Sequence, residues 1–161
     1  MINPRIEQLM NEQIKHEFSS AYLYLAFGAH FASKGMKGFE SWMKKQAAED
    51  QVHAMKFFDF LIDRDGKITL QAIDQPVVKA ETPLQFFTEA LKHERLVTGL
   101  INKIYAAAVE EKDYASQTFL HWFIDEQVEE EANATAVIDL LKLIGESGEG
   151  LLMLDHQLGE R

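Results

Sequence analysis

Ala48-Glu49-Asp50-Gln51-Val52-His53 is the stretch that decides how this chain can fold. It lies in the middle of a helical pattern whose apolar residues are Phe39, Met43, Ala47, Ala54, Phe57 and Leu61. At about 100° per residue, Asp50 falls at the centre of this apolar stripe, and His53 projects from the same face one turn later. Burying a carboxylate in an apolar seam is costly unless it is paired or bound to a metal. The other helices must therefore supply whatever neutralises Asp50.

The composition indicates one acidic domain spanning residues 1–161, because 161 residues of which 47% are hydrophobic can build one sizeable core. There are 26 Asp and Glu against 16 Lys and Arg, a net charge of -10, and no basic run. This balance argues against nucleic acid or an anionic membrane as a partner and favours attraction of cations. The absence of cysteine excludes disulfides, thiolate metal sites and a cysteine nucleophile. The longest apolar run, residues 21–27, is too short to span a bilayer, and the N-terminus lacks the apolar region of a signal peptide. We therefore expect a soluble, cytoplasmic protein.

Helical periodicity and capping residues predict five helices, over residues 4–33, 38–65, 83–111, 114–144 and 150–158. Asn3 followed by Pro4 predicts the start of the first helix. Thr82-Pro83-Leu84-Gln85 is a capping box with Pro at the first helical position and predicts the start of the third. The glycines at 145, 148 and 150 break the pattern before the short last helix. The fold class is therefore all-α.

The lengths of the connections predict how these helices are arranged. Short links make the first and second helices, and the third and fourth, antiparallel neighbours. The irregular segment Lys67 to Glu81, about fifteen residues, can run the length of a helix in extended form. Such a crossover makes the second and third helices parallel. We therefore predict a four-helix bundle with one long crossover and an apolar fifth helix that docks on its own bundle or on a neighbouring subunit.

The other three long helices carry polar side chains at the same depth as Asp50. Glu17 lies within the apolar stripe of the first helix, Glu94 within that of the third, and Gln127 and Glu130 within that of the fourth. Each lies near the midpoint of its helix, so the groups converge in a bundle. No Lys or Arg lies on the inward stripes near these midpoints, so the carboxylates must be protonated or neutralised by cations.

The charge count points to a pair of divalent ions. Glu17, Asp50, Glu94 and Glu130 together carry four negative charges, and neutral His53 adds a nitrogen ligand. Carboxylates with one imidazole suit iron or manganese better than a soft-ligand metal. A Glu and Glu-x-x-His arrangement across four helices is an established description of di-iron bundles and serves here as a template. The competing interpretation is a metal-free helical protein in which the polar core positions only fix the register of the bundle.

Several motifs make the resemblance to a known family specific, and the resemblance covers essentially the whole chain. They are Glu17-Phe18-Ser19-Ser20-Ala21-Tyr22, Glu49-Asp50-Gln51-Val52-His53, Glu94, Phe119-Leu120-His121-Trp122-Phe123, Glu126-Gln127-Val128-Glu129-Glu130-Glu131 and Ser147-Gly148-Glu149-Gly150-Leu151. The chain resembles the bacterial non-haem ferritins. The resemblance implies a ferritin-like fold and a protein that oxidises Fe(II) with dioxygen. It also implies that ferric mineral is stored inside a hollow shell of 24 subunits, with residues 151–158 near the four-fold axes.

The resemblance also implies roles for particular residues. Positions matching Glu17, Asp50 and His53 bind the first iron, and those matching Glu94, Gln127 and Glu130 serve the second. Tyr24 matches a tyrosine thought to take part in electron transfer, and Glu49, Glu126 and Glu129, with Glu130, match a third, outer iron site.

Three of these roles have competing interpretations. Glu49 and Glu126 fall about 100° from the centre of their stripes, so a solvated acidic edge explains them as well as an outer iron site. Tyr24 is explained equally well as a core aromatic with a bonded hydroxyl. Asp50 departs from the family, which usually has the longer Glu at this bridging position, so the bridge could become one-sided.

Related classes make predictions that this sequence does not meet. A bacterioferritin would have a second Glu-x-x-His in place of Gln127-x-x-Glu130 and a haem-ligating Met in place of Gln51, so we expect no haem. A rubrerythrin needs cysteines for its rubredoxin module. A DNA-protecting mini-ferritin typically lacks the tail helix, and a substrate-oxidising di-iron enzyme favours two Glu-x-x-His motifs.

Overall fold

The structure is a computed structural model that describes residues 1–160. Within these residues the helices are α1 (Pro4–Ser33), α2 (Lys37–Asp63), α3 (Pro83–Glu110), α4 (Tyr114–Ile144) and α5 (Gly148–Gly159), and there is no strand. The all-α prediction is confirmed. None of the helices in this part of the chain has a stretch long and apolar enough to cross a membrane.

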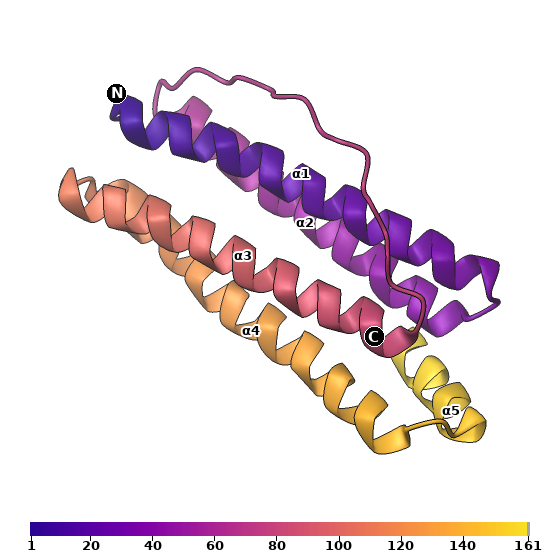
Figure 1. Cartoon of the computed structure of the whole chain (residues 1–161). Coiled ribbons are helices and arrows are strands. Elements are labelled where there is room, and N and C mark those ends of the chain that lie inside the picture. The colour runs from indigo at the N-terminus through magenta and orange to yellow at the C-terminus, as the bar shows by residue number, and fades with distance from the viewer. Residues whose placement is uncertain (161) are drawn as a thin grey trace.

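The four long helices form a bundle, with α5 at one end (Figure 1). The segment between α2 and α3 runs back along α1, so α2 and α3 point the same way, as the length of the crossover predicts. Asn11 of α1 is buried and holds this segment by its backbone: its side chain donates to the carbonyl of Lys67 at 2.9 Å and accepts from the amide of Thr69 at 2.7 Å. The crossover is therefore fixed to the bundle near its start.

Local sequence sets where the helices begin and end. The predicted capping box is present, because the Thr82 side chain accepts from the Gln85 amide and the Gln85 side chain accepts from the Thr82 amide. Helix α2 ends at Asp63, two residues before the predicted position, since Asp65 has a φ of 54° that a helix cannot continue through. Helix α5 begins at Gly148 and not at 150, because Ser147 caps it by accepting from the Gly150 amide at 3.2 Å.

Two apolar clusters fill the bundle, one on each side of a polar layer. One cluster contains Tyr24, Phe39, Phe87 and Ile138, and the other contains Met10, Phe57, Ile101 and Phe123, with further residues in each. On every long helix the chain passes from one cluster to the other through Glu17, Asp50 with His53, Glu94, or Gln127 with Glu130. The predicted midpoints therefore meet at one level of the bundle.

Helix α5 docks on its own bundle, which is one of the two predicted alternatives. Leu154 and Leu158 are buried, and α5 packs mainly against α2. The Asp155 carboxylate accepts from the amide of Phe39 at 2.9 Å and so supplies the cap that α2 lacks at Met36. Gly38 makes this close approach possible, because a Cβ there would lie 1.5 Å from the backbone oxygen of Asp155. The start of α2 and the last helix therefore stabilise each other.

Replacing Gly38 with Ala should separate α5 from α2 and lower the free energy of unfolding by about 1–3 kcal/mol, because the added methyl overlaps backbone that cannot move independently. Thermal unfolding and the rate of proteolysis within α5 measure this effect. Gly99→Ala is the matched control, since a Cβ at Gly99 meets nothing within 4 Å and Ala favours a helix. Equal stability of Gly38→Ala and the parent protein would contradict this account of α5 docking.

Candidate metal centre

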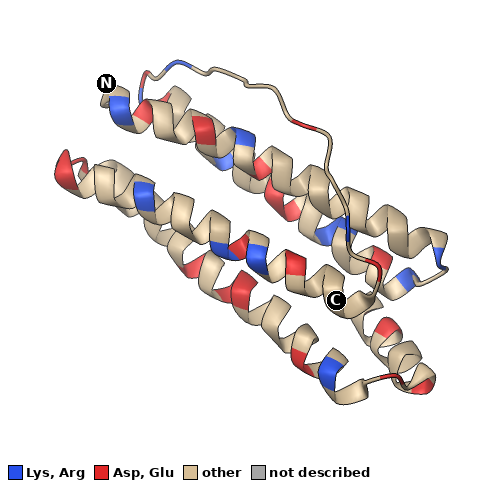
Figure 2. Ribbon diagram, in the orientation of Figure 1, with Lys and Arg blue, Asp and Glu red and all other residues tan. Residues whose placement is uncertain are grey.

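The central polar layer brings together side chains from all four long helices. Acidic residues occur in the middle part of each of these helices (Figure 2). The polar side chains of the layer that face inward are all 5% exposed or less. They are Glu17, Asp50, His53, Glu94, Gln127 and Glu130. Since the layer lies between two apolar clusters, these groups are removed from water as the sequence predicts.

Glu17, Asp50 and His53 form the tightest group in the layer. One ligand atom from each residue lies within 4.8 Å of the other two, a spacing that one metal ion could bridge. His53 Nδ1 is 3.7 Å from Glu17 Oε2 and also 3.7 Å from Asp50 Oδ1. Asp50 Oδ2 is fully buried and has no hydrogen-bond partner within residues 1–160. A buried carboxylate oxygen without a partner is costly, so this oxygen points to a cation as the missing partner.

Glu94 lies on the other side of the layer and is held at both oxygens. The hydroxyl of Tyr24 donates to Glu94 Oε1, and Gln127 Nε2 donates to Glu94 Oε2 at 3.2 Å. Tyr24 is completely buried, so its hydroxyl is both bonded in the core and in direct contact with this carboxylate. Both interpretations of Tyr24 are compatible with this position. Gln127 faces Glu94 with its amide nitrogen, and in this orientation it supports Glu94 and does not offer an oxygen.

Two buried glutamines that the sequence analysis did not single out also belong to the layer. Gln13 Nε2 donates to Glu17 Oε1 at 2.8 Å, and Gln46 Nε2 donates to Glu130 Oε2 at 2.7 Å. Gln13 and Gln46 lie one helical turn before Glu17 and Asp50, on the same faces. That spacing of four residues was the available signal in the sequence.

The electrostatics show that the layer disfavours its own negative charge. Burial, followed by the charges of Glu17, Glu94 and Glu130, raises the pKa of Asp50 well above its ordinary value. Burial also raises the pKa of Glu94, against the hydrogen bonds from Tyr24 and Gln127 that lower it. Within residues 1–160, neither Glu17, Asp50 nor Glu94 forms an ion pair with a Lys or Arg. Divalent cations would supply the positive charge that these carboxylates lack.

The negative charges of the layer also raise the pKa values of two neighbouring groups, His53 and Tyr24. Burial by itself would lower the pKa of His53, but the nearby carboxylates of Glu17 and Glu126 outweigh it and the pKa lies above its ordinary value. Burial, then the charges of Glu94 and Asp50, raises the pKa of the Tyr24 hydroxyl far above its ordinary range. Tyr24 is therefore a neutral hydrogen-bond donor in this environment.

A groove between α2 and α4 leads from the surface to His53. Glu49 and Glu126 both line it, and Glu126 Oε1 is 3.7 Å from His53 Nε2. The ring of Trp122 lies 5.3 Å from that of His53, with Lys56 Nζ 4.2 Å from the centre of the indole. The structure thus brings two of the four predicted outer-site residues, Glu49 and Glu126, into one groove. Glu129 is exposed on α4 and is not among the residues that line it.

These observations first define a class of protein. Four helices bring buried carboxylates, one imidazole and several neutral hydrogen-bond donors to a single layer. This arrangement defines a carboxylate-rich, metal-binding four-helix bundle. Oxygen ligands with one nitrogen suit iron, and the absence of basic partners for Glu17, Asp50 and Glu94 in the described residues fits a site made for cations.

Comparison with known proteins gives the family. A family model described as a ferritin-like domain matches residues 7–144. A bacterial non-heme ferritin of Bacteroides fragilis is 40% identical over 161 residues, all of both chains, and one of Escherichia coli O157:H7 is 33% identical over 158 residues, 98% of this chain and 96% of that one. The open pore ferritin of Archaeoglobus fulgidus is 42% identical with a TM-score of 0.98, covering 100% of this chain and 99% of that chain. The chain belongs to the ferritin family, and its family and fold support a role in iron storage.

Replacing Asp50 with Asn should stabilise the metal-free protein at neutral pH by on the order of 1–3 kcal/mol, because it removes a carboxyl group whose ionised form is disfavoured by burial. The folded state raises the pKa of Asp50, so the parent protein loses stability as pH rises above the ordinary value of 3.8 towards the raised one. The gain from Asn should therefore be larger at pH 7 than at pH 5. Thermal unfolding of chelator-treated protein tests this, with the exposed Asp59→Asn as control; a gain that does not grow with pH would contradict it.

Proposed function

We propose that this protein oxidises Fe(II) to Fe(III) with dioxygen at the central layer and stores the ferric product inside a shell of identical subunits. The observation that carries this proposal is the buried, unpartnered Oδ2 of Asp50, within reach of Glu17 and His53. Family membership supports iron as the metal. Iron is the substrate and the stored cargo, and no haem is required. The 161 residues act as one ferritin-like domain in the cytoplasm.

Two ferrous ions bind at neighbouring positions in the layer. Glu17, Asp50 and His53 hold the first, and Glu94 and Glu130 hold the second, with Gln127 acting through Glu94. The charges of Glu17, Glu94 and Glu130 all act on Asp50, so Asp50 is close to proposed ligands of both ions, and this supports a bridging role. Because burial raises the pKa values of Asp50 and Glu94, protons compete with iron for these two carboxylates, and iron binding should weaken as pH falls.

The charge of the layer favours the oxidised product. Each ferrous ion gives one electron to dioxygen and gains one unit of positive charge, and buried carboxylates attract the more highly charged ion more strongly. Tyr24, in contact with Glu94, is placed to carry an electron to this site. Glu49 and Glu126, in the groove that ends at His53, hold the outer iron together with Glu129 and Glu130.

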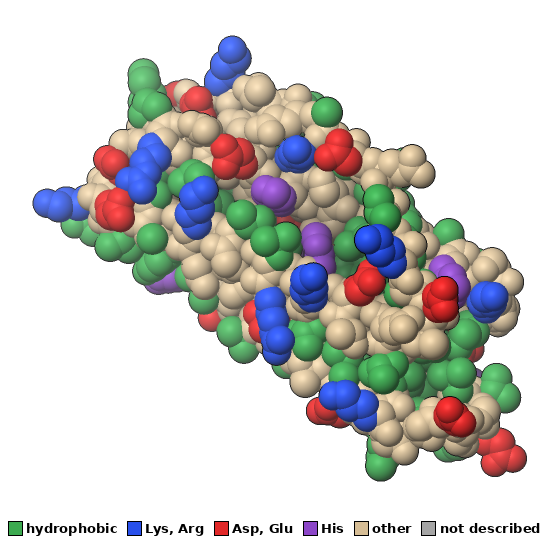
Figure 3. All heavy atoms as spheres, viewed as in Figure 1, with side chains coloured by type: hydrophobic (Ala, Val, Ile, Leu, Met, Phe, Trp, Pro, Cys, Tyr) green, Lys and Arg blue, Asp and Glu red, His purple; other side chains and the backbone are tan. Residues whose placement is uncertain are grey.

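The surface supports assembly into a shell. Leu143, Leu152 and Met153 are 84%, 73% and 74% exposed near the α5 end of the bundle. Hydrophobic side chains gather at this end on the face shown in Figure 3. Large exposed apolar residues of this kind mark sites of protein association. The similar archaeal protein is described as an open pore ferritin, which is consistent with a hollow assembly.

Replacing Glu94 with Ala should slow iron oxidation more than about tenfold, since losing even a group that only orients a ligand commonly costs about 10- to 100-fold. The test is anaerobic Fe(II) titration followed by air, with ferric absorbance recorded against time. Glu89→Ala, on the same helix but outside the layer, is the control. Parent protein that shows no saturable Fe(II) binding, or that oxidises iron no faster than Glu94→Ala, would refute the oxidase proposal.

The assembled protein should have a native mass of about 440 kDa, for 24 subunits of 18.4 kDa each. Size-exclusion chromatography with light scattering measures this mass at neutral pH. Circular dichroism on the same sample verifies that the helices are intact. A folded monomer or dimer under these conditions would contradict the shell while leaving the oxidation chemistry open to its own test.

A further inference from the structure

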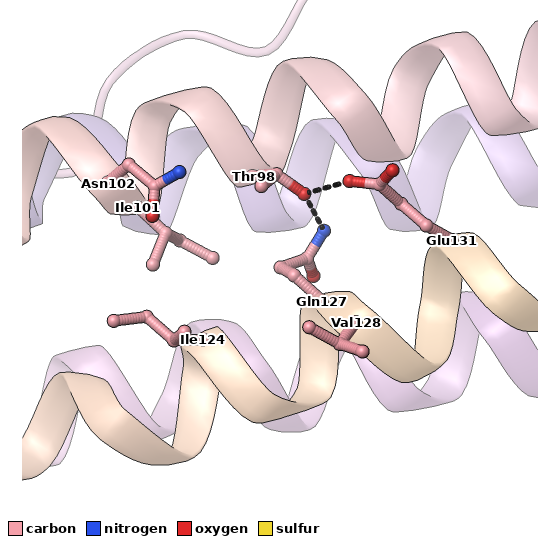
Figure 4. A pocket seen from close by; sticks show the side chains of 7 residues that line it. All are labelled: Thr98, Ile101, Asn102, Ile124, Gln127, Val128 and Glu131. Carbon is pink, nitrogen blue, oxygen red and sulfur yellow. Dashed lines mark hydrogen bonds between the residues drawn. The ribbon is translucent and has the colours of Figure 1, made fainter.

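A chain of hydrogen bonds behind Gln127 joins the central layer to a pocket between α3 and α4. Figure 4 shows Thr98 between Gln127 and Glu131, with its hydroxyl in contact with both side chains. Gln127 Nε2 lies 3.3 Å from Thr98 Oγ1, and Thr98 Oγ1 lies 2.7 Å from Glu131 Oε1. All three residues line the pocket. The chain therefore runs from a partly exposed carboxylate to a buried amide.

The direction of each hydrogen bond in this chain is fixed by chemistry. The Thr98 hydroxyl has one hydrogen, and both of its acceptors are oxygens: Glu131 Oε1 and the backbone carbonyl of Glu94, 3.0 Å away. The shorter bond goes to the charged carboxylate. With its hydrogen on Glu131 Oε1, Thr98 presents only a lone pair to Gln127. Gln127 must therefore direct its NH₂ group, and not its carbonyl, towards Thr98.

This orientation determines what Gln127 does to Glu94. The same NH₂ group lies 3.2 Å from Glu94 Oε2 and 3.1 Å from the backbone oxygen of Glu94. Turning the amide over would place its carbonyl oxygen against these two oxygens and against Thr98, with no hydrogen between them. Glu94 would then keep only the hydrogen bond from Tyr24. Holding Glu94 at both oxygens thus depends on which way the Gln127 amide faces.

We propose that Thr98 and Glu131 are positioning residues for the second metal ion. They fix the Gln127 amide as a hydrogen-bond donor, and that donor holds the Glu94 carboxylate in the position from which it binds the ion. This inference rests on the proposed function, because it assumes that Glu94 binds iron. Arg95 Nε lies 3.5 Å from Glu131 Oε2 and helps to keep that carboxylate next to Thr98. Neither Thr98 nor Glu131 touches the metal, and both act through Gln127.

The test uses Co(II), which reports binding by its visible absorbance and is not oxidised by air under these conditions. Wild-type protein should bind two ions per subunit in the central layer, apart from any ion held at the outer groove. Thr98→Val has nearly the same shape but no hydroxyl. The Gln127 amide is then held only by Glu94, the residue whose carboxylate it positions. We expect its affinity for the second ion to fall about tenfold, the lower end of what loss of a ligand-orienting group costs, with the first ion unaffected. Thr98→Ser should restore wild-type binding.

Two variants of Glu131 separate the hydrogen bond from the charge. Glu131→Gln keeps an oxygen that can accept from Thr98, so it should bind the second ion nearly as wild type does. Glu131→Met removes that acceptor and leaves the Thr98 hydrogen shared between the backbone carbonyl of Glu94 and Gln127, so it should lose affinity in the same direction as Thr98→Val but by a smaller factor. These two variants also keep the inference testable if Thr98→Val does not fold, as judged by circular dichroism.

The outcomes distinguish this inference from the proposed function. Wild-type protein that binds no second ion would overturn the proposed function itself. Wild-type protein that binds two ions, with Thr98→Val or Glu131→Met binding both equally well, would overturn only the positioning role. Loss of the second ion in Thr98→Ser to the same extent as in Thr98→Val would also overturn it, because the γ-methyl group and not the hydroxyl would then matter.

Discussion

The buried layer of Glu17, Asp50, Glu94 and Glu130 is the constraint on which the rest of the structure depends. Four carboxylates and one imidazole lie between two apolar clusters, where the raised pKa values of Asp50 and Glu94 record the cost of negative charge. The apolar clusters above and below must therefore stabilise a bundle that carries an unfavourable centre. A cation in that centre would turn the same charge into a favourable interaction and would thereby couple folding to metal binding.

The groups that hold these carboxylates are neutral. Gln13 donates to Glu17, Gln46 to Glu130, and both Tyr24 and Gln127 to Glu94. A Lys or Arg in any of these places would fix the carboxylate equally well but would also cancel its charge. Amides and a phenol orient the oxygens and leave the negative charge available to a metal ion. The two halves of the layer differ, since the half with His53 has an oxygen of Asp50 without a partner, while Glu94 is held at both oxygens.

The ends of the bundle serve a different purpose from its centre. Asp155 and Gly38 join α5 to the start of α2, and Asn11 holds the crossover against α1. These contacts keep the four helices in register, and the register is what brings Glu17, Asp50 and Glu94 to one level. Membership of the ferritin family and a close structural match along the whole chain agree with this arrangement. The arrangement of the carboxylates in the middle of the bundle thus relies on contacts far from it.

The sequence by itself determined the helices, the parallel crossover and the level at which Glu17, Asp50, Glu94 and Glu130 lie, because helical periodicity sets which face each residue occupies. Only the tertiary structure decided which groups touch. It docked α5 on its own bundle, showed that Gln13 and Gln46 support the layer, and brought Glu49 and Glu126 into one groove although each lies to one side of its own helical stripe. It also fixed the direction of the Gln127 amide, which depends on Thr98 from a neighbouring helix. Rotamers and helix rotation follow from packing between segments far apart in the chain, and periodicity within one segment cannot supply them.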